Sequence, residues 1–273
     1  METTGTGISA KMIAMKALFF FIPLFLLSCN QNAAEHSNQK AGAVRGAISL
    51  KENPYARIFD IPVPAGYSRV NEQPHSFGDW LRNTDLKKDK RVYKYDGTLK
   101  ENQSAQFAVL NISVGNKDLQ QCADAVMRLR AEYLFTEKKF EEISFTDNEG
   151  KQYRFTQPHT RTHFMPYLNT VFGMCGSASL SKQLNTVAFR NIRSGDVLIR
   201  GGFPGHAVIV MDLAQDNEGK KIYLLAQSYM PAQDIHVLIN PVDEKLSPWY
   251  RVTDNERIFT PEYIFKLTEL KRW

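Results

Sequence analysis

The stretch Gly201-Gly-Phe-Pro-Gly-His206-Ala-Val-Ile-Val210 places an apolar, β-branched run directly after a turn of glycines and a proline. Glycine and proline interrupt regular structure, whereas valine and isoleucine favour strands. His206 is therefore expected at the mouth of a strand, beside an open turn.

Similar short runs surround this stretch and predict a sheet. They lie at 196–199, 207–211, 222–226 and 235–239, and the polar segment 216–221 predicts a hairpin loop. Two earlier runs, 91–95 and 106–114, are also strand-like. We expect the later runs to form an antiparallel meander.

Helical spacing of apolar residues marks three other segments. The strongest extends from Asp118 to about residue 140, and Asp118-x-x-Gln121 resembles a capping box. Ser76 predicts a cap for a short helix over 76–82, and 261–270 predicts a closing amphipathic helix. A helix followed by an antiparallel meander indicates an α+β fold.

The composition restricts the class of protein. The chain has 273 residues, of which 43% are hydrophobic, 11% aromatic and 23% charged, close to the globular norm. These fractions exclude a wholly disordered chain and a disulfide-dense miniprotein. The net charge of +5 is a mild excess, and the basic residues form no stripe with interleaved aromatics. No nucleic-acid partner is therefore expected.

The first residues have the features of a bacterial lipoprotein signal in the required order. Lys11 and Lys16 flank an apolar run at 17–27, shorter than the roughly 20 residues that span a bilayer. The run ends in Leu26-Leu-Ser-Cys29, which looks like a lipobox with Cys29 as the lipidated residue. An ordinary secretory signal with an incidental Cys29 is the alternative.

These features predict three parts of the chain. Residues 1–28 are expected to be a signal peptide, 29–52 a flexible tether and 53–273 a single domain. Acyl chains on Cys29 would anchor the domain to a membrane outside the cytoplasm. Since no acidic run follows Cys29, we expect the periplasmic side of the outer membrane.

A thiol nucleophile needs a nearby base and surroundings that favour the thiolate. Cys122 falls near the start of the strongest predicted helix, where free N–H groups and the helix dipole lower a thiol pKa. His206 is the candidate base. Gln227, on the next predicted strand, is the candidate amide that holds the imidazole in the required tautomer.

These residues also have purely structural interpretations. Cys122 lies on the apolar stripe of its helix, where a buried cysteine is commonly a small hydrophobic residue. The alternative for His206 is a histidine buried in the core with its hydrogen bonds satisfied. Cys175 is a rival nucleophile, ranked lower because no strong helix follows it. A Cys122–Cys175 disulfide is a further possibility, since an oxidising compartment permits it.

A metal site is not expected. His159 and His163 have metal-ligand spacing, but they lie between two prolines and lack the glutamate of a zinc-protease helix. We therefore interpret this segment as a loop.

Four runs carry a resemblance to a known family. Residues 118–134, 194–199, 204–210 and 226–233 resemble the domain-of-unknown-function 4846 family, found largely in Bacteroidetes and often lipoprotein-tethered. The similarity extends from about residue 64 to 250. It implies a grouping but no activity.

A second, looser resemblance implies a fold and a chemistry. Gly195-Asp-Val followed by Gly205-His-Ala-Val-Ile-Val210 is similar to NlpC-type and CHAP-type cysteine peptidases and amidases. It implies a papain-like core, with an N-terminal helix carrying Cys122 packed on an antiparallel sheet. It assigns the catalytic roles to Cys122, His206 and Gln227.

The expected function is a cell-envelope thiol hydrolase, a peptidase or amidase with peptidoglycan peptides among its candidate substrates. The Cys122 thiolate attacks the carbonyl, His206 moves the proton, and backbone N–H groups near Cys122 stabilise the oxyanion. A monomer without a cofactor is expected. The alternative is a non-catalytic envelope-binding or scaffold lipoprotein. The expected substrate-binding residues are Gln121, Gly205, Trp80, Ser228 and Tyr229.

Overall fold

The structure is a computed structural model that describes residues 52–273. The predicted signal peptide, the lipidation site Cys29 and the tether up to residue 51 lie outside the described residues. In the part of the chain that is described, no helix has both the length and the apolar character needed to cross a membrane.

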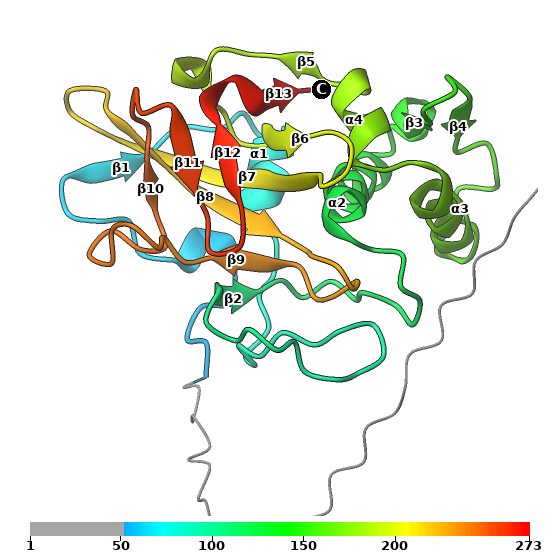
Figure 1. Ribbon diagram of the computed structural model, residues 1–273, viewed down its shortest axis with the longest axis horizontal. Coiled ribbons are helices and arrows are strands. Elements are labelled where there is room, and N and C mark those ends of the chain that lie inside the picture. The colour runs from blue at the N-terminus through cyan, green and yellow to red at the C-terminus, as the bar shows by residue number, and fades with distance from the viewer. Residues whose placement is uncertain (1–51) are drawn as a thin grey trace, which may run out of the picture. The chain divides into compact units, whose positions relative to one another are not determined.

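A nine-stranded antiparallel sheet forms the centre of residues 52–273 (Figure 1). Its main path runs β2-β9-β8-β7-β6-β13-β5, while β1 pairs with β7 and β10 with β8. The bounds on this path are β2 Gln106–Val109, β9 His236–Leu238, β8 Lys221–Gln227, β7 His206–Asp216, β6 Val197–Arg200, β13 Leu270–Arg272 and β5 Asn185–Thr186; those of the two side strands are β1 Tyr67–Arg69 and β10 Tyr250–Arg251.

Two hairpins lie outside this sheet. They are β3 Ser144–Thr146 with β4 Gln152–Arg154, and β11 Arg257–Phe259 with β12 Ile264–Lys266. Short 3₁₀ turns are at η1 Ile58–Asp60, η2 Phe140–Glu142, η3 Phe189–Asn191 and η4 Leu267–Glu269.

Four α-helices accompany the strands: α1 Phe77–Arg82, α2 Cys122–Thr136, α3 Arg161–Met174 and α4 Ser177–Gln183. The cap predicted for α1 is confirmed, because the Ser76 side chain accepts a hydrogen bond from the backbone N–H of Asp79 at 3.1 Å. In α2 the cap is Gln121 rather than Asp118, so the helix begins at Cys122.

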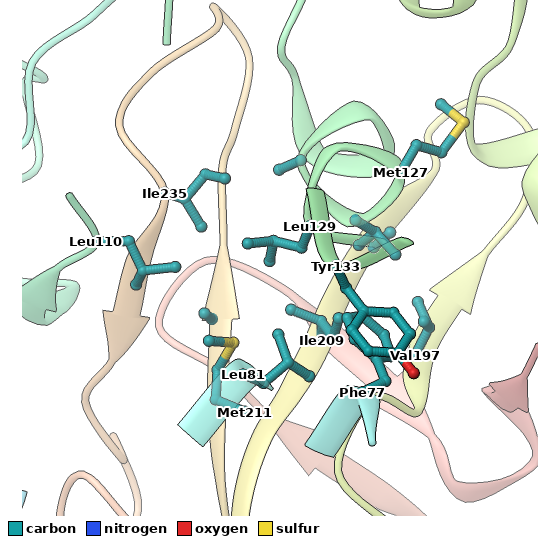
Figure 2. Packing of buried hydrophobic residues seen from close by; sticks show 14 of the residues in the cluster. Phe77, Leu81, Leu110, Met127, Leu129, Tyr133, Val197, Ile209, Met211 and Ile235 are labelled. Carbon is teal, nitrogen blue, oxygen red and sulfur yellow. The ribbon is translucent and has the colours of Figure 1, made fainter. Parts of the chain in front are cut away.

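Side chains of β6 and β7 alternate between two hydrophobic layers. Val197 and Ile209, which are paired across the two strands, belong to the layer that includes α2, as Figure 2 shows with Leu129 and Tyr133 of that helix. The neighbouring residues of the two strands point to the opposite face, where Phe265 of β12 packs. Because both faces are covered, β7 is buried from His206 to Ala214.

The expected fold class is wrong. The described chain is mostly antiparallel sheet with few helices, and a papain-like fold is not shown. The helix that begins with Cys122 is not an N-terminal element, since β1, α1 and β2 precede it. The prediction failed because β1 and β2, which come before this helix, join the same sheet as the strands that follow it.

Residues 261–270 also differ from the prediction, because they form no α-helix. They contain β12, the 3₁₀ turn η4 and the start of β13. In β12, Ile264 and Lys266 are exposed and Phe265 is buried, which is the two-residue alternation of a strand. Strand pairing decides the conformation of this segment: β12 forms a local hairpin with β11, and β13 pairs with β6, which is distant in the sequence.

Candidate active site

Cys122 is the first residue of α2, and its side chain is only 6% exposed. The helix start is held by the Asp124 carboxylate, which accepts the backbone N–H of Gln121 at 3.1 Å. Helix α2 packs against β7, the strand that begins with His206. The structure therefore places the candidate nucleophile and the candidate base at the starts of two neighbouring elements.

The turn before His206 requires glycine. Gly202 has a φ of +100°, in the region that favours glycine. At Gly205 a Cβ would lie 2.3 Å from the carbonyl oxygen of Gly202 and 2.4 Å from Oγ of Ser177. The predicted open turn is thus a tight one, and Gly205 allows the backbone to enter β7 with His206 facing inward.

A continuous chain of hydrogen bonds begins at His206. Its Nε2 lies 2.8 Å from Oε1 of Gln227, and Nε2 of Gln227 donates to Oε2 of Glu262 at 2.7 Å. Lys100 donates to the same oxygen at 2.6 Å. The Lys100 side chain is 5% exposed and that of Glu262 13%, so this ion pair is largely buried.

This chain determines the tautomer of His206. A carboxylate only accepts, so Glu262 holds the NH₂ group of Gln227 toward itself and turns the amide oxygen toward His206. The proton of the neutral imidazole is then on Nε2, and Nδ1 is left with its lone pair. Nδ1 has no hydrogen-bond partner within residues 52–273. An imidazole in this state is a general base.

A second buried histidine completes the cluster. Nε2 of His236 lies 3.4 Å from Nε2 of Gln227, and its Nδ1 lies 2.9 Å from the carbonyl oxygen of Asp234. That carbonyl can only accept, so the proton of His236 is on Nδ1 and its Nε2 is the acceptor for Gln227. Gln227 therefore holds His206 while it is itself held on two sides.

Aromatic rings enclose His206. The ring centroids of Tyr229, Tyr263 and Phe265 lie 4.9, 5.0 and 5.9 Å from that of His206. Burial lowers the pKa of His206 to about 4, against an opposing contribution from the hydrogen bond to Gln227. The imidazole is consequently neutral at pH 7.

Burial raises the pKa of the Cys122 thiol. The backbone N–H of Ala207, which follows His206 in β7, lowers that pKa by less than burial raises it. The N–H groups of Cys122 and Ala123 also favour the thiolate, as the helix start predicts. Burial nevertheless outweighs these N–H groups, because packing against β7 removes the sulfur from water.

The resting site is therefore a neutral thiol beside a neutral imidazole. Within residues 52–273 no direct hydrogen bond joins Cys122 to His206. Catalytic hydrogen bonds are often long before substrate binds. Transfer of a proton from the sulfur to Nδ1 of His206 therefore requires the two groups to come within hydrogen-bond distance when a substrate binds.

The other predicted site residues have different surroundings. Ser228 is fully buried, and its Oγ lies 2.9 Å from the carbonyl oxygen of Gln120, which ties the end of β8 to the segment before α2. Tyr229 lies over His206. Trp80 is not brought to this cluster, since it packs on Tyr133, about 16 Å along α2 from Cys122.

The two cysteines in the described chain are free, so the disulfide considered above is absent. Cys175 ends α3, and burial raises its pKa to about 11. The predicted loop at 159–163 is partly helical: His163 belongs to α3, while His159 stacks on Phe140 with centroids 3.9 Å apart. No group of three or more potential metal ligands occurs within 52–273.

Three members of the cluster were missed in the sequence. Glu262 lies in a segment assigned to a helix, and neither Lys100 nor His236 stands in a recognisable motif. The only signal was a His-containing apolar run at 235–239, which is equally typical of a core strand.

Comparison with known proteins adds a family and no activity. A search of curated proteins and a search of solved structures returned no match. Residues 59–160 and 154–272 match the sequence model described as "Domain of unknown function (4846)". Together these segments span most of the chain, and the protein belongs to the domain of unknown function (4846) family.

Proposed function

We propose that this protein is a thiol hydrolase that cleaves amide bonds in peptides of the cell envelope. The observation that supports it best is the state of His206: Gln227 holds its proton on Nε2, and Nδ1 is a free acceptor at the start of β7, one residue before Ala207, whose N–H favours the Cys122 thiolate. Cys122, His206 and Gln227 are also the set that the peptidase resemblance implies.

The proposed reaction begins from neutral groups. As the Cys122 sulfur attacks the substrate carbonyl, Nδ1 of His206 takes the thiol proton. An S–C bond forms, the C–N bond breaks, and the imidazolium returns the proton to the leaving amine. Water, deprotonated by His206, then hydrolyses the thioester and restores the thiol. Gln227 holds the imidazole in place, and the N–H groups at the start of α2 favour negative charge.

The envelope setting rests on the sequence. The order of basic residues, apolar run and Leu26-Leu-Ser-Cys29 supports a lipid anchor at Cys29. An anchored domain outside the cytoplasm meets peptides of the envelope, including peptidoglycan stems, as its nearest amide substrates.

The test compares two matched variants, Cys122→Ala and Cys175→Ala, since both residues are free, buried cysteines. Envelope peptides are incubated with each purified protein, and new amines are measured by mass spectrometry. We expect Cys122→Ala to lower hydrolysis by roughly a thousandfold or more and Cys175→Ala to leave it unchanged. Hydrolysis retained by Cys122→Ala excludes the proposal.

A non-catalytic envelope-binding protein is the second candidate, favoured by one observation: burial raises the pKa of Cys122 and no hydrogen bond joins it to His206 within 52–273. For this function the wild-type protein binds envelope peptides without cleaving them, and Cys122→Ala binds them equally well. Detection of an acylated Cys122 by mass spectrometry contradicts it.

A further inference from the structure

A second site lies beside the start of α2. A pocket of about 320 Å³ is formed by the segment 113–120, by Arg128 of α2 and by α3. From α3 it takes Met165, Asn169 and Phe172, which share one face because they are four and three residues apart. No residue of the Cys122–His206 cluster lines this pocket.

The pocket is cationic. Arg128 and Lys117 line it, and none of its lining residues is acidic. The charge of Arg128 is only partly compensated, because its partner Glu132 is shared with Arg161. Two guanidinium groups thus face one carboxylate, and exposed Lys117 adds a further positive charge.

Two donors at the pocket lack acceptors within residues 52–273. Arg128 donates through Nε to Glu132 and through Nη1 to Oε1 of Gln120, each at 2.8 Å. Its Nη1 also lies 3.4 Å from the carbonyl oxygen of Ser113, and Nη2 has no acceptor in the described chain. Gln120 lines the pocket and is 1% exposed, and its Nε2 is buried without a hydrogen bond. A buried donor without an acceptor is costly, so its presence in a pocket wall points to an acceptor supplied by a ligand.

The apolar lining residues of the pocket determine the rest of the ligand. Leu119, Met165 and Phe172 give it an apolar surface. A bare inorganic anion would leave these apolar side chains in contact with water. An anionic group on a short aliphatic chain contacts both the cationic and the apolar lining residues. The planar guanidinium of Arg128 matches a carboxylate.

We propose that this pocket binds a carboxylate carried on a short aliphatic chain. Gln120 belongs to the pocket and lies two residues before Cys122, so the pocket adjoins the segment that leads into the candidate nucleophile. The inference rests on the proposed function where it assigns the substrate class: amides with a free carboxylate on a neighbouring aliphatic side chain or terminus. Binding itself requires no catalysis.

The test measures binding of valerate and of valeramide, its uncharged isostere, to the Cys122→Ala protein by NMR titration of the backbone amides of 113–120. We expect valerate to bind roughly tenfold or more tightly than valeramide. Lys117→Glu and Arg128→Gln are expected to abolish this preference. Lys245→Glu, at an exposed lysine outside the pocket, is the matched control and should retain it.

Equal binding of valerate and valeramide, or a preference that survives Lys117→Glu, overturns the inference. Lys117→Glu carries the test if Arg128→Gln does not fold, because Lys117 is exposed while Arg128 is the buried partner of Glu132. Two different results distinguish failure of the proposed function from failure of this inference. A protein that prefers valerate but hydrolyses no amide retains the pocket without the hydrolase, and a hydrolase indifferent to substrate carboxylates retains the activity without the pocket.

Discussion

At the scale of single residues, the orientation of one amide determines the chemistry of the cluster. Gln227 would serve His206 equally well as donor or acceptor, but Glu262 accepts only and so leaves the amide oxygen for the imidazole. Glu262 contacts neither Cys122 nor His206 directly. It is a positioning residue, and Lys100 balances its charge.

The buried ion pair gives two substitutions with opposite effects. Glu262 raises the pKa of His206 and Lys100 lowers it. Glu262→Gln should therefore move the acidic limb of the kcat/KM profile to lower pH and lower kcat/KM roughly tenfold, since the amide of Gln227 is no longer held. Lys100→Met should move that limb to higher pH.

His206 can also be titrated by NMR without any substrate, which separates this prediction from activity. A purely structural role for the pair would lower stability in both variants but would not move the His206 pKa in opposite directions. Shifts of the same sign for the two variants would contradict the positioning role of Glu262.

At the scale of elements, the start of α2 combines a helix cap with a buried carboxyl group. Asp124 is 6% exposed; one of its oxygens accepts the N–H of Gln121, and Oδ1 has no partner within 52–273. Burial raises the pKa of Asp124 well above its usual value. The cap that starts the helix therefore also has an unfavourable effect on the free energy of folding, because the carboxyl group is removed from water.

Asp124→Asn should keep the cap and remove that cost. Above the usual pKa of 3.8 the unfolded chain releases a proton that the folded chain retains, so this group lowers stability as the pH rises. We expect the variant to be more stable at pH 7 by on the order of 1 kcal/mol or more, with the gain disappearing toward pH 4. Urea denaturation at the two pH values measures it.

Asp124→Ala is the control, since it removes the carboxyl group and the cap together. Its gain in stability at pH 7 should be smaller than that of Asp124→Asn. A loss of stability in Asp124→Asn at pH 7 would contradict this account, because burying the amide would then be less favourable than burying the carboxyl group.

At the scale of the whole molecule, two buried histidines link folding to pH. Burial lowers the pKa of His206 and that of His236 from 6.5 to about 4. Between these values the unfolded chain binds protons that the folded chain does not, so stability decreases as the pH falls from 6.5 to 4. Each histidine contributes a loss on the order of 3 kcal/mol across this window.

His236→Asn should reduce that loss by about half, because the variant has one fewer group to protonate on unfolding. The free energy of unfolding, measured by urea denaturation at pH 7 and pH 4.5, gives the difference. His75→Asn is the matched control, since the side chain of His75 is 81% exposed and the substitution should leave the pH dependence unchanged. An unchanged dependence in His236→Asn would mean that His236 is already protonated in the folded protein.

Much of the fold follows from local patterns. The apolar runs at 196–199, 207–211, 222–226 and 235–239 become β6 to β9, and Ser76 caps α1 as predicted, because side-chain alternation and capping involve residues close in sequence. The run at 91–95 forms only isolated bridges, and 261–270 is not helical. Strand pairing decided both segments, partly with near neighbours, such as β11 with β12, and partly with distant ones, such as Gln233 with Lys94 and β6 with β13.

The sequence alone was sufficient to place His206 at a turn before a strand, to place Cys122 near a helix start and to identify the family, since each depends on neighbouring residues. Folding was needed to bring Glu262 and Lys100 to Gln227, because buried charges are stable only where a distant partner meets them. Folding also set the pKa of Cys122, because loss of water against β7 outweighs the N–H groups of its own helix.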